Sequence, residues 1–221
     1  MMRVKICGIA SRDDVDACIT AGADALGFIF ARSPRRLTLD AAAGLTAAVP
    51  PFVTTVGVFA GVPADVVRSA IDACRLDVLQ FSGEESAEFC GSFGKPTIVA
   101  TRSRPWDRGA RTTARAVAVM IDSWTPAQRG GTGRLVPRQL ARRARAENDG
   151  AIVVLAGGLT AANVAPIIRD IRPDAVDART GVEREGKKDP ALVRAFVFAA
   201  RSALAHQDDA REKETAYDGH A

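Results

Sequence analysis

The sequence predicts a (β/α)8 barrel that forms a single domain. Short apolar or β-branched runs occur eight times along the chain, and a connecting segment follows each of them. Strands that alternate with helices pair in parallel, and eight such units close into a barrel. The length of 221 residues suits one large or two small domains, and the eight units follow one another too closely for a second domain. The alternative is an open doubly wound sheet, but that fold usually has a glycine-rich fingerprint after its first strand, and "CGIAS" at 7–11 is not one.

The first four units are regular. In each of them an apolar run precedes a segment with the apolar spacing of a helix, and Gly22 is a stop signal for the first helix. The predicted strands are 3–7, 24–30, 52–59 and 77–81, and the predicted helices are 12–22, 38–48, 63–75 and 84–93.

The second half of the chain contains one irregular unit. The strand predicted at 96–101 precedes "RSRPWDRGARTTARA", which is rich in Arg, Gly and Pro and has no apolar stripe, so we expect a loop or a short helix there. From about 206 the chain has no apolar periodicity, which predicts a barrel domain over 1–205 and a disordered tail over 206–221. The remaining predicted strands are 116–122, 151–156 and 174–178, and the remaining helices are 135–147, 161–171 and 190–205.

Composition argues against several classes of partner. The net charge is +4 and the basic residues are scattered, whereas a nucleic-acid-binding protein usually concentrates them on one face. The densest group, at 138–145, fits the solvated face of a helix. No window approaches the ~18 apolar residues of a membrane span, and the start "MMRVKICGIA" lacks the apolar run of a secretory signal. We therefore expect a cytoplasmic protein that binds neither nucleic acid nor membrane. The outer helices show no decisive apolar patch, so the sequence leaves the oligomeric state open between weak oligomerisation and none.

Cysteine and histidine usage narrows the chemistry. The four cysteines show no CxxC spacing and have no histidine nearby, so no metal site is predicted. Both histidines, His206 and His220, lie in the predicted tail. Acid–base chemistry in the barrel must therefore use carboxylates, thiols or lysines.

Glycine-rich loops follow the seventh and eighth predicted strands, in "AGGLT" at 156–160 and "ARTGVE" at 178–183. Glycines before a helix let the backbone approach a ligand and leave N–H groups pointing at it. Barrels of this fold most often hold a phosphate at these two loops. The sequence therefore predicts a phosphate site at Gly157, Gly158, Thr180 and Gly181.

A carboxylate and a thiol end two of the predicted strands. Asp122 ends an apolar strand and shares its side with Met120, so we expect an apolar barrel mouth to raise its pKa, which suits a general acid. Cys7 ends the first strand on the same side as Lys5. A thiol needs a nearby positive charge to become a useful base. Lys5 could supply that charge, but we expect it to pair with Asp177 on the neighbouring strand, because a buried lysine needs a partner.

Two further loops carry candidate ligand groups. Arg35 and Arg36 follow a proline in the loop after the second strand, where a guanidinium can grip a carboxylate through two parallel hydrogen bonds. An exposed, unengaged arginine is the alternative. Gly131 and Gly133, in the "GGTG" stretch after the sixth strand, are further candidates to line a substrate site.

With these residues assembled, the chain resembles the phosphoribosylanthranilate isomerase family over residues 3 to about 200. The resemblance rests on the order and spacing of several motifs rather than on any one of them. They are "KICGI" at 5–9, "GADALGFIF" at 22–30, "SPR" at 33–35, "VGVF" at 56–59, "LQFSGEE" at 79–85, "IDSWTPAQRGGTG" at 121–133, "LAGGLTAANV" at 155–164 and "VDARTGVEREGKKD" at 176–189.

The resemblance implies a (β/α)8 barrel that catalyses an Amadori rearrangement in tryptophan biosynthesis without a cofactor. It implies that N-(5-phosphoribosyl)anthranilate becomes 1-(2-carboxyphenylamino)-1-deoxy-D-ribulose 5-phosphate, an aminoaldose-to-aminoketose isomerisation. Asp122 would protonate the furanose oxygen as general acid, and Cys7 would remove the C2 proton as general base. Arg35 would bind the anthranilate carboxylate, with Arg36 as the alternative, and the two glycine-rich loops would bind the phosphate.

Three positions depart from the usual family pattern: Ser82 replaces the histidine of the "LQxHG" motif, Ala156 a common serine, and Arg179 a small hydroxyl residue. These departures bear on phosphate binding and substrate range. Two other functions remain open at this point. One is a related isomerase acting on a different N-ribosyl phosphate, for which Arg35 would be dispensable, and the other is a non-catalytic barrel that binds a partner.

Overall fold

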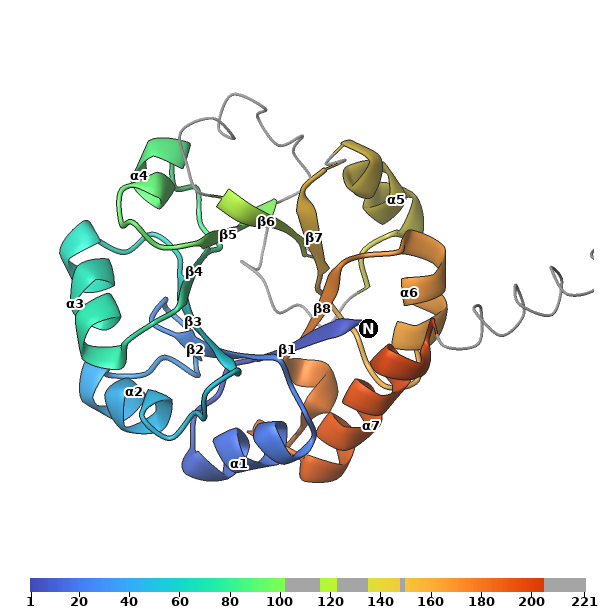
Figure 1. The fold of residues 1–221 in the computed structure, drawn as a ribbon, viewed down its shortest axis with the longest axis horizontal. Coiled ribbons are helices and arrows are strands. Elements are labelled where there is room, and N and C mark those ends of the chain that lie inside the picture. The colour runs from blue at the N-terminus through green and yellow to red at the C-terminus, as the bar shows by residue number, and fades with distance from the viewer. Residues whose placement is uncertain (102–115, 123–134, 148–149, 205–221) are drawn as a thin grey trace, which may run out of the picture.

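In a computed structural model of the chain, eight parallel strands form a closed barrel with helices around it (Figure 1). The structure describes residues 1–101, 116–122, 135–147 and 150–204. Each strand pairs with the next along the chain, and β8 pairs with β1 to close the ring, so the predicted fold class is confirmed. The strands are β1 (Arg3–Cys7), β2 (Ala25–Ile29), β3 (Thr54–Phe59), β4 (Val78–Phe81), β5 (Thr97–Thr101), β6 (Ala116–Ile121), β7 (Ile152–Leu155) and β8 (Ala175–Ala178).

Helices cover the outside of the barrel, and α7 lies between α1 and α6 (Figure 1). They pack side by side because each connection returns the chain to the amino end of the next strand. The helices are α1 (Arg12–Thr20), α2 (Leu39–Thr46), α3 (Ala64–Cys74), α4 (Ala87–Gly91), α5 (Arg138–Glu147), α6 (Val164–Ile171) and α7 (Pro190–Ser202).

Predicted and observed elements differ mainly at their ends. The third strand begins at Thr54 rather than at 52, because Phe52 has a φ of 71° and cannot continue an extended strand. The fourth helix has only five residues, with Ser86 capping its start and Ser92 as the C-cap residue at its end. The predicted loop or short helix at 102–116 falls almost wholly outside the described residues, as does the predicted tail.

Alternation along the strands separates two apolar layers. Inward-facing side chains such as Val56, Met120 and Val154 fill the barrel. Outward-facing side chains such as Ile6, Leu26 and Phe28 pack under the helices in the main core. The inward layer ends at the carboxyl edge of the strands in a smaller cluster that includes Cys7, Ile29 and Val58. The thiol therefore stands where the apolar interior meets the loops.

The segment between β8 and α7 forms an extra element at this edge. A short 3-10 helix, η2 (Thr180–Val182), precedes a hairpin of β9 (Glu183–Arg184) and β10 (Lys187–Lys188). Its turn residues, Glu185 and Gly186, both have positive φ, 51° and 79°, the geometry of tight hairpin turns. Asp189 then caps α7, accepting hydrogen bonds from the N–H groups of Ala191 and Leu192.

In the described part of the chain no helix is both long and apolar enough to cross a membrane.

Candidate active site

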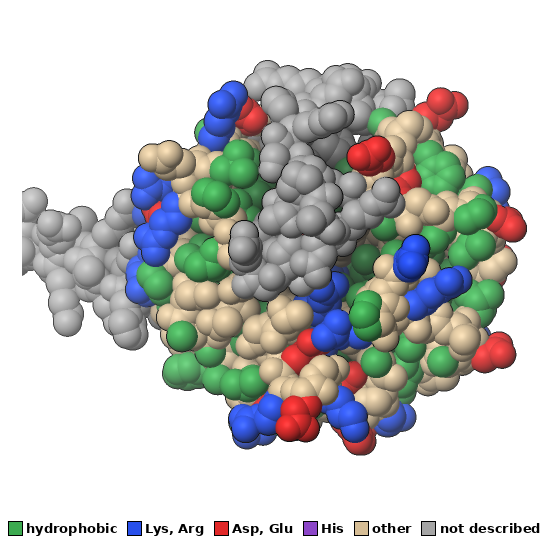
Figure 2. Space-filling model, turned by 180° about the vertical axis from the view of Figure 1, so that it is seen from behind, with side chains coloured by type: hydrophobic (Ala, Val, Ile, Leu, Met, Phe, Trp, Pro, Cys, Tyr) green, Lys and Arg blue, Asp and Glu red, His purple; other side chains and the backbone are tan. Residues whose placement is uncertain are grey.

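A cavity of ≈ 400 Å³ lies at the carboxyl ends of the strands. It is the place where barrels of this fold build their sites. Figure 2 shows the molecule from behind Figure 1, and Lys and Arg side chains lie near the middle of that face. Of the residues predicted for the site, the cavity brings together Cys7, Asp122, Gly157, Gly158, Thr180 and Gly181. Gly131 and Gly133 lie outside the described residues.

Cys7 is held by the close approach of the neighbouring strand. It pairs with Gly27 of β2, and its side chain is almost fully buried. A Cβ on Gly27 would lie 2.9 Å from Cys7 Sγ and 3.1 Å from Lys5 Nζ. Glycine is required at 27 because the thiol and the amine occupy the space that a side chain would take. The next residue, Gly8, has a φ of 77°, which turns the chain sharply after the thiol.

Lys5 pairs with Asp177, as the sequence predicted. The distance from Nζ to Oδ1 is 2.7 Å, and both side chains are buried. Burial, the largest single influence, lowers the pKa of Lys5, but Asp177 and Cys7 together outweigh it, so the net pKa of the lysine is raised and the ammonium form is favoured. This ion pair lies inside the barrel, one layer of side chains below the thiol.

Burial is the largest influence on the pKa of Cys7. It raises the pKa of the thiol, while the positive charges of Lys5, Arg179 and Lys188 lower it in part and the negative charge of Asp177 raises it. The net pKa is raised, so the neutral thiol is the resting form at neutral pH. A positively charged intermediate beside the sulfur would shift this balance toward the thiolate.

Asp122 follows β6 and lines the same cavity as Cys7. Met120, two residues earlier, also lines the cavity and is 1% exposed, as the alternation of the strand predicted. The carboxylate and the thiol thus face one space from strands that are not neighbours in the ring. A sugar ring placed between them can meet an acid on one side and a base on the other.

The loops after β7 and β8 meet at the predicted phosphate site. Gly157 and Gly158 have φ values of 87° and 61°, a region that favours glycine, and in the described part of the protein their N–H groups donate no hydrogen bond. A Cβ on Gly181 would lie 1.9 Å from the carbonyl oxygen of Leu159. The two loops are therefore packed backbone to backbone, with amides available for an anion.

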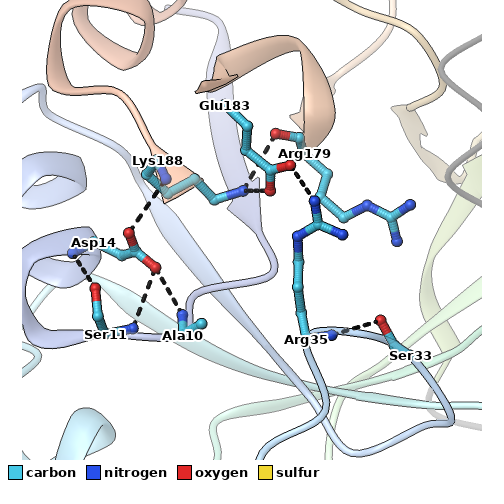
Figure 3. Close-up of polar contacts among 8 residues, drawn as sticks. All are labelled: Ala10, Ser11, Asp14, Ser33, Arg35, Arg179, Glu183 and Lys188. Carbon is cyan, nitrogen blue, oxygen red and sulfur yellow. Dashed lines mark hydrogen bonds and ion pairs between the residues drawn. The ribbon is translucent and has the colours of Figure 1, made fainter. Parts of the chain in front are cut away.

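Arg35 lies beside the cavity rather than on its lining. Its guanidinium forms an ion pair with Glu183, and its backbone N–H donates to Ser33 Oγ at 3.2 Å (Figure 3). Ser33 itself lines the cavity. Arg36, the alternative carboxylate ligand, is exposed. The position of Arg35 next to the loop after β1 is also marked by Gly8, because a Cβ there would lie 3.1 Å from Arg35 Cδ.

Sequence reasoning missed Gln80, which also lines the cavity. It is 4% exposed, its Nε2 donates to Ser82 Oγ at 3.0 Å, and its Oε1 has no hydrogen-bond partner among the described residues. A glutamine inside the otherwise apolar run "DVLQF" was the available signal. Its free acceptor can meet a substrate hydroxyl or amine.

Arg179 was singled out only as a departure from the family motif, yet its side chain lines the cavity. Its Cδ approaches the same point above Gly8 as that of Arg35, at 3.3 Å, and its buried Nε has no partner among the described residues. Within the described ranges no group of three or more His, Cys, Asp or Glu side chains could hold a metal ion.

Comparison with known proteins shows the family of this chain. A sequence model of the family described as N-(5'phosphoribosyl)anthranilate (PRA) isomerase matches residues 4–199. The chain belongs to the PRA isomerase family. An N-(5'-phosphoribosyl)anthranilate isomerase of Thiobacillus denitrificans is 44% identical over 211 residues, covering 91% of this chain and 98% of that protein. This family isomerises an aldose to a ketose in tryptophan biosynthesis, and that is the function of this chain.

Solved structures show the same fold. The phosphoribosyl anthranilate isomerase of Thermus thermophilus superposes with a TM-score of 0.79 at 36% identity, covering 91% of this chain and 99% of that one. A second isomerase structure superposes with a TM-score of 0.74 at 30% identity, covering 91% and 100%. That protein is in complex with reduced 1-(o-carboxyphenylamino)-1-deoxyribulose 5-phosphate.

Proposed function

We propose that Cys7 and Asp122 perform the isomerisation as a base and an acid acting on one substrate from opposite sides. The observation that carries the proposal is that both side chains line the same cavity from non-neighbouring strands, next to two glycine-rich loops. The substrate is N-(5'-phosphoribosyl)anthranilate, which carries a phosphate at one end and an aromatic carboxylate at the other.

The chemistry proceeds in two proton transfers. Asp122 gives its proton to the furanose oxygen, the bond from C1 to that oxygen breaks, and the nitrogen lone pair forms a C=N double bond. Cys7, as thiolate, then takes the proton from C2, and the electron pair moves through C1 to the nitrogen. The resulting enolamine tautomerises to the aminoketose. The positive nitrogen formed in the first step favours the thiolate needed for the second, which offsets the effect of burial on the pKa of Cys7.

Different groups of the protein bind the two ends of the substrate. The amides of Gly157 and Gly158, together with Thr180 and Gly181, receive the phosphate. Arg35 receives the carboxylate through guanidinium N–H groups that Glu183 does not use. A related structure is in complex with reduced 1-(o-carboxyphenylamino)-1-deoxyribulose 5-phosphate, a compound that bears both anions. We place the reaction in the reducing cytoplasm, in keeping with the free cysteines at 7, 18, 74 and 90.

The test is turnover of freshly prepared N-(5'-phosphoribosyl)anthranilate, followed by the decay of its fluorescence. We expect the purified chain to consume it, and Cys7→Ser and Asp122→Asn to lose activity by roughly 10²–10⁴-fold each, the usual contribution of a general acid or base. The far-UV circular dichroism of both variants should match that of the parent protein.

Cys74→Ser is the matched control. Its thiol is also buried, but it donates to the carbonyl oxygen of Leu39 and does not line the cavity. This variant should keep its activity. Near-normal turnover by Cys7→Ser or Asp122→Asn would remove that residue from the mechanism.

A further inference from the structure

The Glu183 carboxylate lies between two cations at the edge of the cavity (Figure 3). Its Oε2 accepts from Arg35 Nη2, and its Oε1 accepts from Lys188 Nζ at 2.7 Å. The side-chain exposures are 18% for Arg35, 5% for Glu183 and 1% for Lys188, so all three charges are largely removed from water. Interactions among them are therefore stronger than on a surface.

The β9–β10 hairpin builds this arrangement. Glu183 and Lys188 are directly paired across the hairpin, so their side chains project from the same face. Lys188 is fixed again by its surroundings, because its Nζ donates to the carbonyl oxygen of Arg179 at 3.2 Å and its backbone N–H to Asp14 Oδ1 at 3.4 Å. Asp14 in turn accepts from the N–H of Ala10 in the loop after β1. The hairpin thus ties Glu183 to a rigid frame formed by the chain around β1 and β8.

The sum of the charges explains why two residues are needed rather than one. Glu183 alone would hold the Arg35 guanidinium but would also cancel its charge and repel an incoming carboxylate. Lys188 neutralises Glu183, so the set keeps one net positive charge. The buried Nε of Arg35 has no hydrogen-bond partner among the described residues.

We propose that Glu183 and Lys188 are positioning residues that hold Arg35 for the substrate carboxylate and preserve its positive charge. The proposal rests on the role proposed above for Arg35. In it, Glu183 sets the direction of the guanidinium and Lys188 keeps the site positive. Together they determine the preference of the enzyme for a substrate whose aromatic ring carries a carboxylate.

The experiment measures binding of two ligands by calorimetry. One is reduced 1-(o-carboxyphenylamino)-1-deoxyribulose 5-phosphate, and the other is the same compound without the carboxylate. The ratio of their dissociation constants is the carboxylate preference. Arg35→Met should lower it by roughly 10–100-fold, the worth of hydrogen bonds to a charged group. Lys188→Met should lower it by roughly tenfold, and Glu183→Gln by roughly threefold, within the coupling expected of contacting charges.

The double variant Glu183→Gln/Lys188→Met gives the sharpest reading. Because the neutral glutamine side chain cannot cancel the charge of Arg35, the double variant should recover the preference of Glu183→Gln alone, above that of Lys188→Met. A purely structural role would make the double variant no better than Lys188→Met. Lys187→Met is the matched control, since this neighbouring lysine is exposed and should leave the preference unchanged.

Each outcome decides one question. If Arg35→Met leaves the preference intact, the proposed role of Arg35 is wrong. If Arg35→Met abolishes it while Glu183→Gln and Lys188→Met do not change it, only the positioning role is overturned. A double variant no better than Lys188→Met overturns the charge balance. Should Lys188→Met fail to fold, an unchanged preference in Glu183→Gln would by itself overturn the positioning role.

Discussion

Two buried lysines flank the cavity, and they are used differently. Lys5, inside the barrel, pairs with Asp177, and that ion pair is electrically neutral. Lys188, in the hairpin, shares Glu183 with Arg35, so that set is positive. Both lysines need a partner because an unpaired buried charge is costly. The neutral Lys5–Asp177 pair fills the barrel under Cys7, whereas the positive set of Arg35, Glu183 and Lys188 can attract an anion.

The largest effect should come from breaking the neutral pair. Lys5→Met leaves the Asp177 carboxylate buried without its partner, and we expect a loss of about 3–5 kcal/mol in the free energy of unfolding. Urea denaturation followed by circular dichroism would measure it. The double variant Lys5→Met/Asp177→Leu removes both charges and should be more stable than Lys5→Met. Equal stability of Lys5→Met and the parent would show that the pair does not stabilise the fold.

Gly27→Ala should change the position of the Cys7 thiol without changing any charge near it. The new methyl group would meet Cys7 Sγ and Lys5 Nζ at 2.9 and 3.1 Å, so the thiol must move while every charge is retained. A displacement of ~1 Å at a reacting group can cost about 10²-fold in rate. We expect kcat to fall by about that factor with a native circular dichroism spectrum. Gly44→Ala, where a Cβ meets nothing within 4 Å, is the control and should retain full activity.

A smaller effect should come from Arg179→Ser, which removes a positive charge near the thiol and keeps the backbone carbonyl that Lys188 uses. Since Arg179 lowers the pKa of Cys7, its loss should raise that pKa further. The active form needs the Cys7 thiolate together with protonated Asp122, so a higher thiol pKa lowers the plateau of kcat/KM. We expect this fall to be smaller than the fall in Gly27→Ala. The alkaline limb of the pH profile should move to higher pH. A limb that stays in place would show that Arg179 does not act on the thiol.

The smallest effect should come from breaking an ion pair on the solvent-exposed surface of the protein. Arg143 and Glu147 pair at 2.7 Å on α5, but the arginine side chain is 73% exposed. Exposed pairs of this kind contribute little. Arg143→Gln should leave the thermal midpoint and the turnover unchanged, in contrast to Lys5→Met. A marked loss of stability would mean that burial is not what separates these pairs.

Much of the fold and part of the candidate site could be predicted from the sequence because they depend on local periodicity. Strand alternation placed Cys7 and Asp122 at the barrel mouth and paired Lys5 with Asp177. The order of eight strand-and-helix units determined the closed barrel. The catalytic and binding roles of these residues stay predictions, since the structure brings their side chains together but does not show the reaction.

Contacts between distant segments could not be predicted in the same way. Arg35 and Glu183 are separated by 148 positions, and no periodicity relates them. The need for glycine at 27 arises from two side chains on another strand. Phe52 looked like a strand residue by composition, yet its backbone turns there with a positive φ. The first two follow from packing between distant segments, whereas Phe52 is an exposed residue in a backbone turn that composition does not indicate.

The contact between Gly181 and the Leu159 carbonyl has a consequence for variation at this position. With only 1.9 Å available to any Cβ, even the smallest side chain would force the two backbones apart. A library that randomises residue 181 should therefore yield glycine alone among functional clones. New ligand specificities at this end of the barrel would have to evolve elsewhere, through residues such as Arg179 whose side chains line the cavity.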